Sequence, residues 1–251
     1  MLHLRTLGGL WLEADDRTVL SDLGGRSLGV LAVAAVAGPG GVTREQLLGI
    51  LWPEVDEERG RHNLSQLLYN LKRQLATEVI VAGAKSGTLR ISSALMSSDL
   101  EAFRAAVSTR DWATATRCYA GPFLAGFYLE DAPEFERWVE ETRSGLRHDG
   151  ERAIEARAEA AQRQGEAAEA RDCWRRLTEL DPLNSRFAYG YVLALAMSGD
   201  RGGAVRHGTA HAARLQEELG SAPSSRLSDL LQRLQKGTFV SSPREDVPGL
   251  N

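Results

Sequence analysis

The chain has 251 residues, of which 43% are hydrophobic and 25% are charged, and its formal net charge is −4. This balance is typical of a soluble globular protein and excludes a mainly disordered chain. The longest apolar run, 29–37, is too short to cross a bilayer, and the first residues lack the features of a signal peptide, so we expect a cytoplasmic protein with no membrane partner.

Short alternating segments and turns open the chain. Residues 2–6 and 10–12, separated by two glycines, predict a small antiparallel sheet, with a second turn at residues 15–16. The apolar segment that follows, 28–37, predicts a buried helix. Ser27 is the expected cap of this helix, and the glycines and proline after residue 37 are expected to end it.

Two further helices and a hairpin are predicted before residue 95. Thr43 followed three residues later by Gln46 is a capping-box pattern, which predicts a helix that ends at Pro53. A longer helix is predicted over 57–75, because Leu64, Leu67, Leu68, Leu71 and Leu75 return at helical spacing along one face. Residues 79–91 then predict a β-hairpin, with a turn at 82–87. Together with the first sheet, this order of elements is that of a winged helix.

From residue 98 onward the pattern is helical almost throughout. The predicted helices cover 99–109, 111–119, 133–164, 166–180, 184–197, 200–219 and 224–235. The string at 164–166, Gln-Gly-Glu, recurs as Ser-Gly-Asp at 198–200, a shift of 34 residues that matches the period of tetratricopeptide repeats. We therefore predict a mainly α protein. Its expected parts are a winged-helix DNA-binding domain over 1–95, an all-helical, tetratricopeptide-like domain over 96–237 and a disordered tail over 238–251.

Charge is distributed unevenly around the 57–75 helix. Residues 54–58 hold four acidic residues and no basic one, whereas 59–90 hold six basic residues and one acidic residue. At 100° per residue, the face opposite the leucines carries guanidinium, imidazole, amide and hydroxyl groups, which bind base edges and phosphates in a major groove. The candidates for base contacts are Arg59, His62, Asn63 and Gln66, and the candidates for phosphate contacts are Tyr69, Asn70 and Arg73.

An ordinary solvated helix face is the alternative interpretation of these residues. Such faces usually carry Glu and Lys, and this one has no acidic residue from Arg59 through Leu75. DNA contact is therefore the favoured hypothesis for the helix. Lys85, at the tip of the predicted hairpin, is a candidate for a minor-groove or phosphate contact, and a solvated turn is its alternative.

Other reactive residues form no recognisable site. His207 and His211 have a spacing that suits zinc, but no third ligand is evident, so we interpret them as surface or half-buried histidines and expect no metal. The two cysteines, Cys118 and Cys173, are interpreted as reduced thiols, with a disulfide between them as the alternative. Core packing is the expected role of Trp112, Phe135, Trp138 and Trp174. We expect neither catalysis nor a cofactor.

Several strings in order resemble a known family. They are 4–9 (LRTLGG), 51–53 (LWP), 64–75 (LSQLLYNLKRQL), 121–127 (GPFLAGF), 133–138 (PEFERW) and 180–183 (LDPL). The first three resemble OmpR-type winged helices, and the others resemble the bacterial transcriptional activator domain. Together they are similar to the antibiotic-regulatory, SARP-type activators. Larger members carry an ATPase module, but this chain has no Gly-rich loop ending in Gly-Lys-Ser/Thr.

The resemblance implies a transcription activator that acts on double-stranded promoter DNA, commonly at direct repeats. It implies that the helical domain supports self-association on DNA and contact with RNA polymerase. For the acidic turn of the winged helix it implies a polymerase contact through Glu54, Asp56 and Glu57. The alternative function is a protein-interaction adaptor whose winged helix no longer binds DNA.

Overall fold

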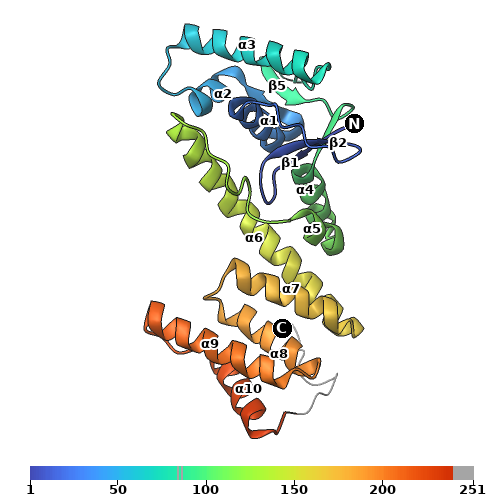
Figure 1. Cartoon of the computed structure of the whole chain (residues 1–251), viewed down its shortest axis with the longest axis vertical. Coiled ribbons are helices and arrows are strands. Elements are labelled where there is room, and N and C mark those ends of the chain that lie inside the picture. Colours follow the sequence, from blue (N-terminus) through green and yellow to red (C-terminus); the bar gives the residue numbers. More distant parts are fainter. Residues whose placement is uncertain (84, 86, 240–251) are drawn as a thin grey trace. The chain divides into compact units, whose positions relative to one another are not determined.

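The computed structural model describes residues 1–83, 85 and 87–239 (Figure 1). The chain forms two compact units, residues 1–150 and residues from 151 onward. These units differ from the domain limits predicted from the sequence, 1–95 and 96–237, because the helices that follow residue 98 contribute to the first unit. The two units are defined by contacts between residues, whereas the predicted limits follow sequence patterns. The division into units therefore does not test those limits, which stay a prediction.

A three-stranded sheet opens the first unit, in the order β2-β1-β6. Strands β1 (Leu2–Arg5) and β2 (Trp11–Ala14) pair antiparallel, as the alternating pattern predicts. Strand β6 (Met96–Ser98) lies parallel to β1, with Leu2 opposite Met96. The sequence analysis missed β6 because its three residues are too few to show alternation, and its partner lies more than 90 residues earlier.

Three helices follow the first two strands. They are α1 (Gly25–Ala37), α2 (Arg44–Leu51) and α3 (Glu57–Leu75), with a 3₁₀ turn at Gly38–Gly40. The capping box at the start of α2 is confirmed, since the Thr43 hydroxyl accepts from the Gln46 N–H and the Gln46 side chain accepts from the Thr43 N–H. The expected Ser27 cap of α1 is wrong. Extended Gly24 is the N-cap, and Ser27 lies in the first turn, where its N–H donates to the Gly24 carbonyl.

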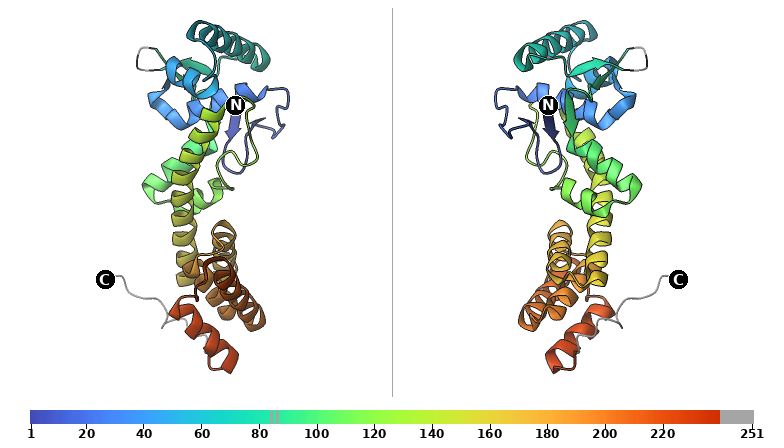
Figure 2. Two further views of the ribbon diagram at one scale, coloured as in Figure 1. Left: turned by 90° about the vertical axis from the view of Figure 1, so that its left-hand side faces the viewer. Right: turned by 90° about the vertical axis from the view of Figure 1, so that its right-hand side faces the viewer.

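A second small sheet completes the winged helix. Its order is β3-β5-β4, with β4 (Ile80–Ala82) and β5 (Thr88–Ile91) forming the predicted hairpin and β3 (Val42–Thr43) pairing with β5. The turn of the hairpin includes Ala84 and Ser86, which lie outside the described residues. Figure 2 shows α3 running across one end of the first unit, above α1 and α2.

Helices α4 (Asp99–Thr109) and α5 (Trp112–Cys118) complete the first unit together with the first half of α6 (Pro133–Gln164). The buried Asp99 carboxylate joins α4 to the end of β1, because it accepts hydrogen bonds from the Thr6 N–H, the Thr6 hydroxyl and the Leu7 N–H. Aromatic contacts hold α6 against the segment before it, because the Phe135 ring lies 5.9 Å from that of Phe127 and the Trp138 ring lies 5.8 Å from that of Phe123. Phe135 is fully buried, as its predicted core role requires.

The second unit contains the end of α6, with α7 (Ala167–Leu180), α8 (Ser185–Met197), α9 (Arg201–Leu219) and α10 (Ser225–Lys236). The 34-residue repeat has a structural counterpart. Gly165 and Gly199 both adopt a left-handed φ, +78° and +86°, and each immediately precedes the N-cap residue of a helix, Glu166 for α7 and Asp200 for α9. Each consecutive pair of helices from α7 to α10 is in contact, and Trp174 is buried on α7.

The first two residues of the predicted tail pack on the second unit. The Thr238 N–H donates to the Arg233 carbonyl, and the Phe239 side chain packs against the buried cluster of α8, α9 and α10. These two residues therefore differ from the expected disordered tail, whereas 240–251 lie outside the described residues. Both cysteines, Cys118 and Cys173, are free thiols, and burial raises the pKa of each. No helix in the described ranges has the length and apolar character to span a bilayer.

Candidate nucleic-acid interface

Helix α3 is held at the surface of the first unit by a narrow apolar side. Leu64 and Leu71 are buried, and Leu67 and Leu68 are half-buried. Gly60 lies against the Leu48 side chain of α2, where an added Cβ would come within 3.3 Å of a Leu48 methyl group. A small residue at this position lets α3 approach α2 closely, and the rest of the helix surface stays open to solvent.

The predicted DNA-contacting residues lie along the exposed side of α3. Six of them are classed as exposed, namely Arg59, His62, Asn63, Gln66, Tyr69 and Arg73. Tyr69 is 61% exposed, which is unusual for a large aromatic side chain without a partner on its surface. Asn70 is half-buried, so its side chain is less accessible than the others. Seven of the eight predicted residues thus lie on one side of α3, with Asn70 toward the core, whereas Lys85 lies on the hairpin.

The charged members of this surface are free to bind an anion. In the described part of the chain, no ion pair involves the Arg59 or the Arg73 side chain. Arg61, on the same helix, pairs instead with Glu57 one turn earlier. Because unpaired guanidinium groups keep their N–H donors for an incoming partner, Arg59 and Arg73 are the cations of α3 that suit phosphate or base contact.

The amide residues of α3 line a shallow hollow toward α1. This hollow of about 380 Å³ is bounded by Asn63, Gln66 and Asn70 from α3 and by Gly24 and Trp52 from the core side. The Gln66 Nε2 donates to the Asn70 Oδ1 at 3.3 Å, a long hydrogen bond at the surface of the helix. Such a bond costs little to break, so both amides keep donors and acceptors for another partner.

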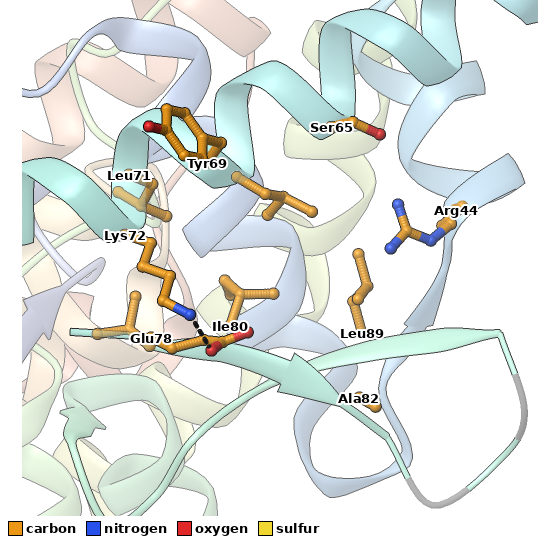
Figure 3. Close-up of a pocket in the computed structure, with 11 residues that line it drawn as sticks. Arg44, Ser65, Tyr69, Leu71, Lys72, Glu78, Ile80, Ala82 and Leu89 are labelled. Atoms are coloured by element: carbon orange, nitrogen blue, oxygen red, sulfur yellow. Dashed lines mark hydrogen bonds and ion pairs between the residues drawn. The ribbon is translucent and has the colours of Figure 1, made fainter.

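A groove lies on the opposite flank of α3, between the helix and the β4–β5 hairpin (Figure 3). It has a volume of about 400 Å³, and the helix contributes Ser65, Tyr69 and Lys72 to its wall. Arg44, the first residue of α2, reaches the same groove. The Lys72 ammonium pairs with the Glu78 carboxylate at 2.6 Å, which leaves Arg44 as the groove's unpaired cation among the described residues.

Arg44 was missed by the sequence analysis. The residue follows the Thr43 cap directly, and nothing in the spacing of α2 relates it to α3 or to the hairpin. Only the pairing of β3 with β5 places the start of α2 beside the hairpin and therefore beside the groove. Lys85 lies at the far end of this hairpin with an exposed side chain, and its carbonyl accepts from the Thr88 N–H and hydroxyl.

Two acidic residues of the turn before α3 have structural functions that were not predicted from the sequence. Glu54, Asp56 and Glu57 are all exposed. The Asp56 carboxylate accepts a hydrogen bond from the Arg59 N–H at 3.0 Å and so caps α3. Glu57 is paired with Arg61. Of the three acidic residues, Glu54 is therefore the one whose carboxylate has no such function in the described structure.

The two histidines of α9 serve packing. His207 is half-buried, as interpreted from the sequence, but His211 is buried, so the interpretation is wrong for His211. Both ring nitrogens of His211 have partners, with Nδ1 3.2 Å from the Pro182 carbonyl and Nε2 3.1 Å from the Ser185 hydroxyl. The His207 ring packs edge-on against Tyr191, and burial lowers the pKa of both histidines. Among the described residues no group of three or more His, Cys, Asp or Glu could hold a metal ion.

Comparison with known proteins gives a family match and a solved structure of similar fold. The family model of the bacterial transcriptional activator domain matches residues 92–235. The solved structure of Mycobacterium tuberculosis EmbR in complex with a low-affinity phosphopeptide is similar over 94% of this chain, with a TM-score of 0.66 and 22% sequence identity. The matched region spans 65% of that EmbR chain. No curated protein matches the chain.

Proposed function

The chain belongs to the bacterial transcriptional activator domain family, and from this premise we propose that it activates transcription by binding promoter DNA through α3. The observation that carries the proposal is the exposed surface of α3, which has unpaired guanidinium groups, amides, an imidazole and a phenol, and no acidic residue after Glu58. These are the groups that bond base edges and phosphates when a helix enters a major groove.

Position along α3 suggests how the contacts are divided. Arg59, His62, Asn63 and Gln66 lie in its first half, and winged helices and related motifs place this end of the reading helix against base edges. Tyr69, Asn70 and Arg73 lie in its second half and are proposed to contact phosphates. Lys85 on the hairpin is proposed to reach a phosphate or the adjacent minor groove.

The groove between α3 and the hairpin extends this interface. With α3 in a major groove, the DNA backbone that borders this groove would pass the hairpin. The unpaired Arg44 guanidinium lies between α3 and the hairpin. We propose that Arg44 contacts a phosphate there, with the Ser65 and Tyr69 hydroxyl groups as neutral donors along the same wall.

Activation requires a second partner besides DNA. Phosphate repels the exposed acidic turn at residues 54–58, so we infer that this turn faces away from the DNA and contacts another partner. We propose that Glu54, together with Asp56 and Glu57, contacts RNA polymerase. The helical region that the family model covers is proposed to support contact between copies of the protein bound at direct repeats.

Sequencing of genomic DNA fragments retained by the purified protein tests the proposal directly. A shared sequence is expected among the fragments bound by the parent, and the triple variant R59A/H62A/Q66A is expected to lose that enrichment. The matched control is R163A, which removes an exposed arginine of α6 distant in sequence from the winged helix. Equal enrichment by the parent and the triple variant would contradict the assignment to α3. Absence of any shared sequence would favour the adaptor function instead.

A further inference from the structure

A separate cavity lies within the first unit, where the end of α1, the end of β5 and helix α4 meet. Its volume is about 390 Å³, within the range of small-molecule sites in proteins. Ala34, Ala35 and Pro39 contribute an apolar wall from the α1 end, and Ala105 contributes to the wall from α4. The cavity shares no lining residue with the groove beside α3.

Two guanidinium groups border this apolar space, those of Arg90 on β5 and Arg104 on α4. Neither forms an ion pair within the described ranges of the chain. Arg104 Nη1 donates to the Val36 carbonyl at 2.7 Å, and Arg90 Nη1 donates to the Ile91 carbonyl at 3.2 Å. Each bond uses one donor and orients the side chain, and a guanidinium has five N–H donors, so most remain available.

The charge around the cavity favours an anion. Glu101 is the acidic residue among the lining groups, against the two arginines. Partial burial lowers the pKa of Arg104 from its ordinary value, and the nearby Asp149 opposes that effect. Because the ordinary value of an arginine lies far above neutral pH, Arg104 keeps its charge. Arg90 is half-buried and Arg104 is exposed. An anion bound beside the half-buried Arg90, which forms no ion pair in the described ranges, offsets the cost of burying that cation, and Arg104 supplies further charged donors from the rim.

We propose that this cavity binds a small molecule that carries one carboxylate or sulfonate group on an apolar body. The apolar part packs against Ala34, Ala35 and Pro39, and the anionic group accepts hydrogen bonds from Arg90 and Arg104. Such a ligand contacts both the winged helix and α4, which lies in the segment matched by the activator domain model. Binding therefore stabilises the packing of α4 on α1 and β5.

Fluorescence titration with 8-anilinonaphthalene-1-sulfonate tests the proposal, because this probe carries one sulfonate on an aromatic body. We expect saturable binding of one molecule per chain and a higher melting temperature in its presence. N-Phenyl-1-naphthylamine, the same aromatic body without the sulfonate, is expected to bind at least about tenfold more weakly, since it cannot accept the charged hydrogen bonds. Equal affinity of the two probes would overturn the anionic class of ligand.

Variants locate the binding. R90Q and R104Q are each expected to weaken sulfonate binding about tenfold, while R163Q, a matched arginine change on α6, is expected to leave it unchanged. A105W fills the cavity and is expected to abolish binding without removing a charge. Because R104Q also removes the bond to Val36, each variant is checked by circular dichroism and thermal unfolding. Parent-like probe affinity in folded A105W and R90Q would place the probe elsewhere and refute the inference.

Discussion

Replacing Asp99 with alanine is expected to destabilise the first unit more than any surface change. Asp99 is 7% exposed, and its carboxylate accepts from the Thr6 N–H at 2.9 Å, from the Thr6 hydroxyl at 2.7 Å and from the Leu7 N–H at 2.9 Å. Thr6 and Leu7 are themselves buried, so in D99A both backbone donors lose their acceptor in a place that water does not reach.

The size of the effect follows from these contacts. A buried donor left without an acceptor costs about 1–3 kcal/mol. Two such backbone donors, with a smaller contribution from the lost negative charge in the first turn of α4, give an expected loss of about 4 kcal/mol in the free energy of unfolding. This loss is a large part of the 5–15 kcal/mol that is typical of whole domains, so D99A is expected to be marginally stable.

Urea unfolding followed by tryptophan fluorescence measures this loss. Four of the five tryptophans lie within the first 150 residues, so the signal reports mainly on the first unit. With a denaturant slope of about 2 kcal/mol per molar, the midpoint is expected to fall by about 2 M. The control T6V removes only the hydroxyl donor and is expected to cost about 1 kcal/mol. A loss below 1 kcal/mol in D99A would refute the inferred role of this carboxylate.

Four further predictions concern DNA binding, activation, assembly and pH. Q66A is expected to weaken binding to the cognate site by about 1–3 kcal/mol relative to random DNA. R73A is expected to weaken binding to the cognate site and to random DNA alike, and to reduce the slope of log affinity against log salt concentration by about one. Fluorescence anisotropy measures both effects. E54A/E57A, which leaves the cap of α3 in place, is expected to reduce transcription in vitro at unchanged or slightly higher DNA affinity; a large loss of affinity would contradict the polymerase contact. Cooperative binding to direct repeats is expected to disappear when the spacing changes by about five base pairs, and equal cooperativity in gel-shift titrations at both spacings would refute side-by-side binding. Burial lowers the folded-state pKa of His211 below 6.5. As the pH falls below 6.5, the unfolded state binds a proton at this residue before the folded state does, so the free energy of unfolding falls by at most about 1.4 kcal/mol per pH unit. H211Q lacks this proton and is expected to show a shallower pH dependence in thermal unfolding between pH 6.5 and 5.

Local patterns in the sequence determined most helices of this protein. The leucine spacing of α3 and the Thr43–Gln46 capping box act within a few residues, and the structure has both features where the pattern places them. The predicted helix over 133–164 coincides with α6 for the same reason. Periodicity also determined which side chains share the exposed side of α3, because the helix geometry alone arranges them.

Tertiary structure decided the features that depend on distant partners. Strand β6 exists because Met96 pairs with Leu2, and Asp99 is buried because the two residues after β1, Thr6 and Leu7, donate to its carboxylate. Arg44 joins the groove beside α3 only through the pairing of β3 with β5. In each case the stabilising contact joins segments that are far apart in sequence, so no local pattern carries its signal. The same holds for the cavity at Arg90 and Arg104, whose walls come from elements that are separate in sequence.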